Sequence, residues 1–99
     1  MILTIEQIQR DAAVYFKDKP VKEVYLFGSY ATGQALEKSD VDILFELKED
    51  TRISYFGLAK YLIDLEKILN KKVDLVEKKF VFPRLNESID KEKILLYRL

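Results

Sequence analysis

Three aspartates are the residues of this chain that are best placed to do chemistry. Asp40 and Asp42 are separated by one residue, and Asp74 interrupts an apolar run over residues 73–76. On a strand, residues two apart point to the same face, with Cα atoms roughly 6–7 Å apart. Two ionised carboxylates this close repel each other, and a divalent cation held between them removes the repulsion. The pair therefore predicts a metal site.

The composition restricts which metal and which chemistry are possible. The chain contains no histidine and no cysteine, which excludes cysteine-ligated zinc and thiol nucleophiles. Oxygen ligands suit magnesium, manganese or calcium better than zinc or copper. If Asp74 lies on a strand beside Asp42, three carboxylates meet, as in two-metal phosphoryl chemistry. Asp74 would then bind the metal on the acceptor side and could accept the proton of the attacking hydroxyl.

A glycine–serine pair, Gly28-Ser29, follows a run of apolar residues and is suited to bind phosphate. A strand that turns into a helix at this pair aims free backbone amides and a hydroxyl at one point, and a glycine lets the backbone approach closely. Gly28 and Gly33 also have the separation of P-loop glycines. However, Gln34 and Ala35 replace the lysine and the serine or threonine that a P-loop needs, so the P-loop interpretation fails.

Local patterns predict the elements that must position these residues. Thr4 and Gln7 have the spacing of a capping box, and Pro20 disfavours helix in the residue before it. An apolar, β-branched run predicts a strand buried on both faces, and strict alternation places Asp40 and Asp42 on one face of the next strand. The expected elements are a helix over 5–17, a strand over 21–27, a short helix within 30–36, a loop over 37–39 and a strand over 40–47.

The second half of the chain continues the alternation of helices and strands. Ser54 can begin a helix and Asn70 can end it; we expect its apolar stripe in the core, namely Leu58, Leu62, Leu65 and Leu69, joined by Tyr61 and Ile68. A strand over 73–77 and a short helix over 83–89 follow, while 94–97 fits a strand or a helical turn. The order predicts an α/β (α+β) fold, with a small mixed sheet of three to four strands flanked by helices, as a single domain over 1–99.

Charge and hydropathy narrow the partners and the location. Lys plus Arg and Asp plus Glu both number 17 among 99 residues, so a broad electrostatic footprint for duplex nucleic acid is not expected. The basic pairs Lys71-Lys72 and Lys78-Lys79 are expected to form a solvated rim. The chain begins without the pattern of a signal peptide and has no run near the roughly 20 apolar residues of a membrane span. A cytoplasmic protein is therefore expected.

Some residues near the aspartates allow two interpretations. Tyr30 is expected to pack on the surface rather than to stack on a base or a partner. Glu46 shares the face of Asp42, but we expect it at an exposed strand end beyond reach of the metal. The aromatic pair Phe80 and Phe82 could form a partner surface or part of the core, and both interpretations remain open.

Gly28-Ser29, Gly33, Ser39-Asp40-x-Asp42 and Asp74 together resemble the signature of the nucleotidyltransferase superfamily related to DNA polymerase beta. Within it, the chain is similar to the minimal nucleotidyltransferases, the antitoxin half of two-gene systems with HEPN-domain proteins. The resemblance covers residues 21–77. It implies a nucleotidyltransferase fold in which Gly28 and Ser29 bind the triphosphate, Asp40 and Asp42 bind Mg²⁺, and Asp74 serves the acceptor side.

The reaction implied by the resemblance is transfer of AMP from ATP to a hydroxyl, a tyrosine of the HEPN toxin, which the modification silences. The alternative is an antitoxin that neutralises its toxin by binding alone. Transfer to a small molecule, as in antibiotic-modifying relatives, is disfavoured because so short a chain has little room for an acceptor domain. Many relatives carry Arg in place of Thr32 and Glu in place of Gln34, so one possible phosphate contact is missing while the metal site is unaffected.

Overall fold

The computed structural model describes all of residues 1–99. One four-stranded sheet runs in the order β3-β2-β1-β4, and its strands are β1 (Val21–Phe27), β2 (Val41–Leu47), β3 (Val73–Glu77) and β4 (Ile94–Arg98). β1 pairs antiparallel with β2 and with β4, whereas β2 and β3 run parallel. The predicted mixed sheet is thus confirmed, and residues 94–97, left open between a strand and a helical turn, belong to the fourth strand.

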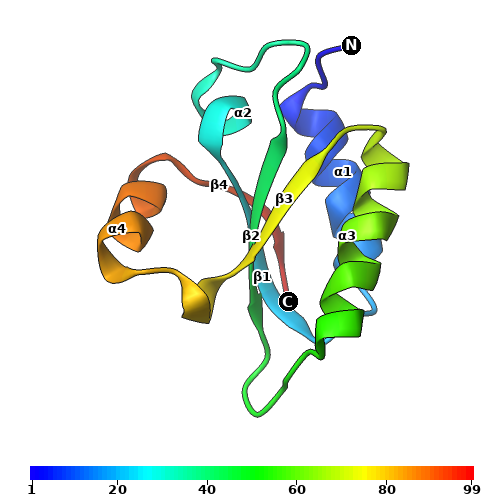
Figure 1. Cartoon of the computed structure of the whole chain (residues 1–99), viewed down its shortest axis with the longest axis vertical. Coiled ribbons are helices and arrows are strands. Elements are labelled where there is room, and N and C mark those ends of the chain that lie inside the picture. The colour runs from blue at the N-terminus through cyan, green and yellow to red at the C-terminus, as the bar shows by residue number, and fades with distance from the viewer.

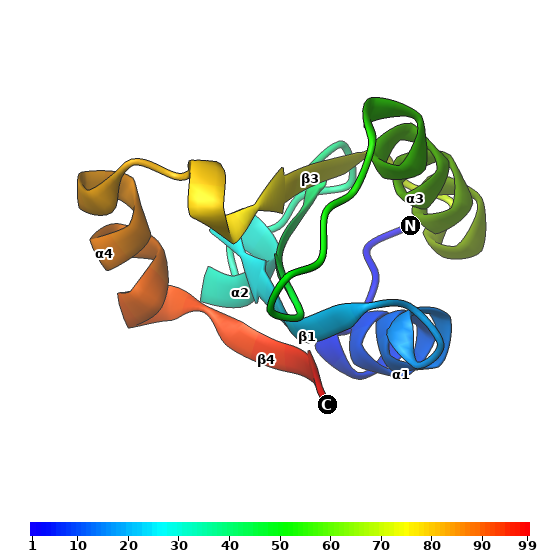
Figure 2. The same cartoon turned by 90° about the horizontal axis from the view of Figure 1, so that it is seen from below.

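The helices cover both faces of this sheet (Figures 1 and 2). They are α1 (Ile5–Phe16), α2 (Gly28–Thr32), α3 (Tyr55–Leu69) and α4 (Pro83–Glu92), with a 3₁₀ turn, η1 (Lys78–Phe80), after β3. α1 and α3 lie on one side of the sheet and α4 lies on the other (Figure 2). Parallel strands need a long crossover connection, and α3 supplies it between β2 and β3. None of the helices is both long and apolar enough to cross a membrane.

Capping residues begin α1 and α3, and end α3, where the sequence predicts. The Thr4 hydroxyl accepts a hydrogen bond from the Gln7 backbone N–H, and the Gln7 side chain accepts one from the Thr4 N–H at 2.9 Å, so the capping box is present. The Ser54 hydroxyl accepts from the Gly57 N–H at 3.0 Å at the start of α3. Asn70 ends α3 in the left-handed region at φ 53°.

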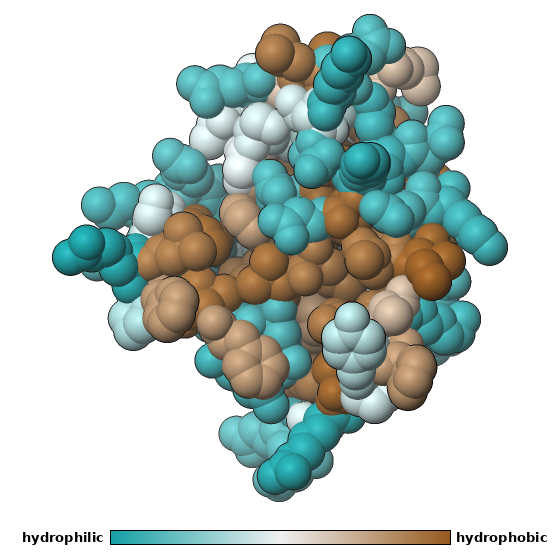
Figure 3. All heavy atoms as spheres, viewed as in Figure 1, coloured by the Kyte–Doolittle hydropathy of each residue, from teal (hydrophilic) through white to brown (hydrophobic).

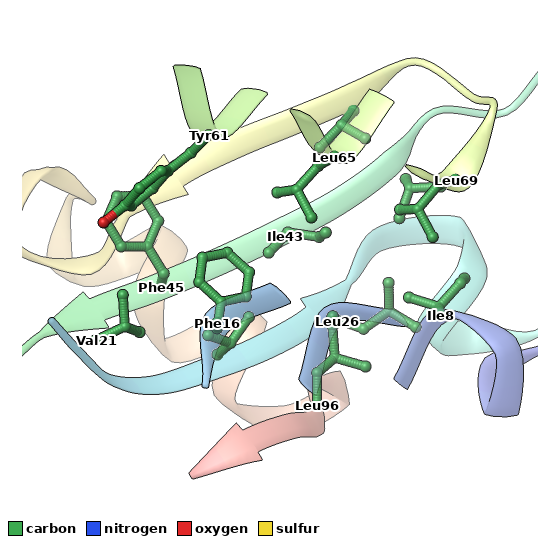
Figure 4. Packing of buried hydrophobic residues seen from close by; sticks show 14 of the residues in the cluster. Ile8, Phe16, Val21, Leu26, Ile43, Phe45, Tyr61, Leu65, Leu69 and Leu96 are labelled. Atoms are coloured by element: carbon green, nitrogen blue, oxygen red, sulfur yellow. The ribbon is translucent and has the colours of Figure 1, made fainter. Parts of the chain in front are cut away.

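The main core fills the space between the sheet and the pair α1 and α3 (Figure 4). Along β2, the alternate residues Val41, Ile43, Phe45 and Leu47 are all buried in it, as the alternation predicts. The Tyr61 ring packs edge-on against Phe45 at 6.2 Å and Phe16 at 5.9 Å. A smaller cluster of Tyr25, Leu44 and Ile89 lies on the opposite face of the sheet, where α4 covers it.

Three helices and one strand differ from their predicted bounds. α1 ends at Phe16 rather than at residue 17, and β2 begins at Val41, so Asp40 lies just before the strand rather than in it. α2 spans Gly28–Thr32 rather than lying within 30–36, because Gly33 takes a left-handed φ of 77° and ends it. α4 continues beyond the predicted residue 89 to Glu92.

The leucine stripe of α3 is only partly in the core. Leu65 and Leu69 are buried, whereas Leu58 and Leu62 are half-buried and Ile68 is 44% exposed. α3 packs against β3, which lies at one edge of the sheet. One end of the stripe therefore extends past the covered surface.

The core predicts a large difference between two substitutions in α3. Leu65→Ala should lower the free energy of unfolding by about 2–5 kcal/mol, because Leu65 is fully buried and its removal leaves a cavity. Ile63→Ala, on the same helix but 53% exposed, should change it by less than about 1 kcal/mol. Urea denaturation measures both, and equal losses would contradict this description of the core.

Candidate functional site

The site lies where β1 ends and where β2 and β3 begin. Phe27 pairs with Asp42 in the antiparallel ladder, and Asp42 pairs with Asp74 in the parallel one. Directly paired residues of neighbouring strands project to the same face, about 4.8 Å apart. Asp42 and Asp74 therefore lie side by side, on the sheet face opposite α1 and α3.

Asp40 stands just before β2 and is exposed. Its charge still acts on Asp42 and destabilises the ionised form of that carboxyl. No group of three or more acidic side chains is close enough together in this structure to hold a metal ion. The structure therefore shows an Asp42–Asp74 pair with Asp40 nearby, and the predicted ligand set of three aspartates stays a prediction.

The Asp42 carboxylate occupies an electrostatically unfavourable position. Its pKa is raised from 3.8 to about 6, first by burial and then by the neighbouring charges of Asp74 and Asp40. No lysine or arginine forms an ion pair with any of these aspartates. A divalent cation would supply the missing positive charge, and a donor set of carboxylate oxygens suits Mg²⁺. The residues present therefore fit the predicted metal.

Gly28 is required at its position for two separate reasons. Its φ of 71° lies in the left-handed region, which strains any residue that has a Cβ. In addition, a Cβ placed there would overlap Oδ2 of Asp42 and lie 2.8 Å from its Cγ. The backbone of Gly28 is thus packed directly against the Asp42 carboxylate, which brings the first turn of α2 beside the acidic pair.

α2 begins without a side-chain cap. Phe27 occupies the capping position and makes no side-chain hydrogen bond there. Ser29 follows in the first turn and is half-buried. Gly28 therefore lies against Asp42 with Ser29 next to it in the chain, and the predicted role of this pair in binding phosphate stays a prediction.

The Tyr30 side chain is buried in the protein, and the Thr32 hydroxyl is hydrogen-bonded to the backbone of α2. Tyr30 is only 3% exposed and belongs to the main core, so the expectation of surface packing is wrong. Its hydroxyl accepts a hydrogen bond from the Leu3 N–H at 3.4 Å. The Thr32 hydroxyl donates to the carbonyl oxygens of Gly28 and Ser29, each at 3.4 Å.

Sequence reasoning missed the position of two lysines beside Asp40. Lys71 and Lys72 line a surface hollow together with Asp40 and Ser39, and the Lys71 ammonium donates to the Glu37 carbonyl at 2.7 Å. The signal was available, because these lysines directly precede β3 just as Asp40 directly precedes the parallel strand β2. The hollow places these basic side chains beside Asp40. By contrast, Lys78 lies 3.6 Å from Glu46 in an ion pair.

Comparison with known proteins identifies what this arrangement is similar to. The model of the nucleotidyltransferase domain family matches residues 9–96. A Methanocaldococcus jannaschii protein provisionally named a protein adenylyltransferase is 41% identical over 92 residues, which cover 91% of this chain and 92% of that protein. The protein adenylyltransferase MntA of Thermococcus cleftensis is 33% identical over 98 residues, which cover 94% of this chain and 96% of that protein.

Two solved structures share the fold. One, provisionally described as a minimal nucleotidyltransferase, aligns with a TM-score of 0.76 at 32% identity, over 93% of this chain and 95% of that chain. The other comes from a complex of a tri-AMPylated Shewanella oneidensis HEPN toxin with its MNT antitoxin. It aligns with a TM-score of 0.73 at 19% identity, over 95% of this chain and 72% of that chain. The predicted nucleotidyltransferase fold is confirmed.

The contact of Gly28 with Asp42 predicts unequal effects at the two glycines of left-handed φ. A Cβ at Gly33 meets no atom within 4 Å. Gly33→Ala should therefore lower the free energy of unfolding by only about 1–2 kcal/mol, through the strain of a left-handed backbone. Gly28→Ala should lower the free energy of unfolding by about 1–3 kcal/mol more than Gly33→Ala, because its methyl group also displaces Asp42. Urea denaturation of both variants measures the difference, and equal costs would show that Gly28 does not pack on the carboxylate.

The raised pKa of Asp42 predicts a pH-dependent stability in metal-free buffer. The unfolded carboxyl ionises near pH 3.8 and the folded one near pH 6, so ionisation destabilises the folded chain as the pH rises through this interval. At pH 7, Asp42→Asn should therefore be more stable than the parent by on the order of 1–3 kcal/mol. The advantage should vanish below about pH 4. Thermal unfolding from pH 3 to 8 checks this, and an advantage independent of pH would contradict it.

Proposed function

Because this chain belongs to the nucleotidyltransferase domain family, we propose that it is a magnesium-dependent enzyme that transfers AMP from ATP to a protein hydroxyl. The acceptor in this proposal is a tyrosine of a HEPN-domain toxin, which the chain silences as its antitoxin. The observation that carries the proposal is the placement of Asp42 beside Asp74 and against Gly28. The relatives support the choice of AMP and partner, since one is named a protein adenylyltransferase and a solved complex contains an AMPylated HEPN toxin.

Each site residue has a part in this reaction. Gly28 and Ser29 bind the triphosphate through the backbone at the start of α2 and the serine hydroxyl. Asp40 and Asp42 hold the metal, with Asp74 on the acceptor side. Bound Mg²⁺ shields the charge of the phosphates and lowers the pKa of the acceptor hydroxyl. The half-buried position of Asp42 favours a cation strongly, because that carboxylate lacks any other positive partner.

The transfer is a substitution at phosphorus. The acceptor oxygen forms a bond to the α-phosphorus of ATP, and the bond from that phosphorus to the oxygen that bridges to the β-phosphate breaks. Pyrophosphate leaves with the electron pair of this bond, and the proton of the hydroxyl passes to the Asp74 carboxylate. Asp74 suits this role because it is exposed at the beginning of β3, an edge strand of the sheet, where a second molecule can reach it.

The chain supplies the nucleotide end of the reaction and its partner supplies the hydroxyl. Residues 1–99 act as a single domain in this proposal, built on one sheet. We place the reaction in the cytoplasm, where ATP is available.

The direct test combines the chain with ATP, Mg²⁺ and the protein encoded by the neighbouring gene, which the proposal requires to carry a HEPN domain. Intact-mass spectrometry should show the partner gaining the mass of AMP, and peptide mapping should place it on a tyrosine. Asp42→Asn should slow the transfer by at least about a hundredfold, because the variant loses a charge that holds the metal. Removing Mg²⁺ with a chelator should stop the reaction.

A matched control is Asp50→Asn, which removes one carboxylate from a loop residue whose φ of 58° suits asparagine. This variant should transfer AMP at the parental rate. If Asp42→Asn also keeps the parental rate, or if the partner gains no mass, catalysis by this site is wrong. The alternative of an antitoxin that acts by binding alone requires Asp42→Asn to neutralise the toxin as well as the parent does.

A further inference from the structure

The edge strand β3 lies in an apolar surface that the fold leaves uncovered. β3 pairs only with β2, so its other side meets no strand. Exposed aromatic side chains flank it on both sides in the chain: Tyr55, at the start of α3, is 83% exposed, while Phe80 and Phe82, between β3 and α4, are 72% and 78% exposed. These residues and those between them make an apolar band, which we define as Tyr55, Leu62, Leu75, Val76, Phe80 and Phe82.

The middle of the apolar band is continuous. A hollow of about 140 Å³ between α3 and β3 is lined only by apolar residues, among them Tyr55, Leu62 and Leu75. Val76, next along β3, packs partly on the small cluster beneath α4. The view onto β3 shows apolar side chains running without a break from the α4 side to the α3 side (Figure 3).

An apolar surface of this kind is typical of a protein interface. Large aromatic side chains are costly to expose and are enriched among the residues that contribute most to binding energy. Phe80 and Phe82 are also not used by either core cluster. Of the two interpretations that the sequence leaves open for this pair, the partner surface is therefore the one that the structure supports.

We propose that the apolar band is the surface on which the acceptor protein docks, an inference that rests on the proposed function. The band and the reaction site share one strand and one face, because Val76 lies two residues after Asp74 in β3 and packs on the cluster beneath α4. A protein that covers Val76 and the exposed rings of Phe80 and Phe82 is held beside the acidic pair. One of its hydroxyls can then reach the phosphorus while the rest of the partner stays bound.

A second copy of the chain fits this surface less well. It would cover the open side of β3 and obstruct the approach to Asp74, which is exposed in the isolated chain. A partner that brings its own hydroxyl to the same place instead uses the exposed side of Asp74.

Two substitutions can test the apolar band without disturbing the fold. Phe82 precedes the first residue of α4 and Tyr55 is the first residue of α3. Aspartate is favoured at a helix cap and in a first turn, so Phe82→Asp and Tyr55→Asp should fold as the parent does. The matched control is Val14→Asp on α1, which is 72% exposed and lies outside the band.

The experiment measures three quantities for the parent and each variant, with the protein encoded by the neighbouring gene as the probe. Calorimetry gives the Kd for that protein, a second titration gives the Kd for a non-hydrolysable ATP analogue with Mg²⁺, and mass spectrometry gives the transfer rate against partner concentration. Each band variant should weaken partner binding by about tenfold or more. Nucleotide binding should not change, and transfer should recover at high partner concentration. Val14→Asp should match the parent throughout.

The outcomes separate docking from catalysis. If the band variants bind the partner within about twofold of the parent, the docking surface is wrong, although loss of transfer in Asp42→Asn would still support the proposed function. If instead Asp42→Asn transfers AMP normally, the proposed function fails, whatever the band variants do to binding. A parent dimer in light scattering that Phe82→Asp dissociates would assign the band to a second copy and overturn the inference.

Discussion

The negative charge of Asp42 is the feature on which the rest of the site depends. The carboxylate is half-buried, stands beside Asp74, packs against Gly28 and has no cationic side chain as partner. Each contact makes ionisation less favourable, and the raised pKa is the sum of these effects. A fold selected for stability alone would remove this charge or pair it with a lysine. Its retention is explained if the positive charge comes from a bound metal.

One face of the sheet carries the main apolar core, and the other face carries the candidate site. One face carries the main core beneath α1 and α3, with β2 contributing Ile43 and Phe45. The alternate residue Asp42 of the same strand projects to the other face, where the apolar cluster beneath α4 is small. The tightly packed face holds the register of the strands, and the register holds Asp42 beside Asp74. This support allows an unfavourable charge to persist at the end of the sheet.

Patterns of short range predicted most of this structure. Alternation along β2 gave both the buried face and the direction of Asp42, and the capping residues gave the start of α1 and both ends of α3. The sequence alone could not predict that Asp42 pairs with Asp74, because strand order depends on contacts between residues far apart in the chain. The burial of Tyr30 was missed for the same reason, since its hydroxyl contacts Leu3. The close contact between the Gly28 backbone and Asp42 could not be predicted either, because the two residues lie on opposite sides of the β1–β2 ladder.

A crystal structure of the chain with Mn²⁺ and a non-hydrolysable ATP analogue would show whether Asp42 and its neighbours bind a metal. Manganese takes the place of magnesium and is located by its anomalous scattering. We expect an ion bound by carboxylate oxygens of Asp40 and Asp42, with the triphosphate on the backbone of Gly28 and Ser29 and with Asp74 facing the α-phosphorus. An ion bound elsewhere, or an Asp74 side chain turned away from the nucleotide, would contradict this expectation.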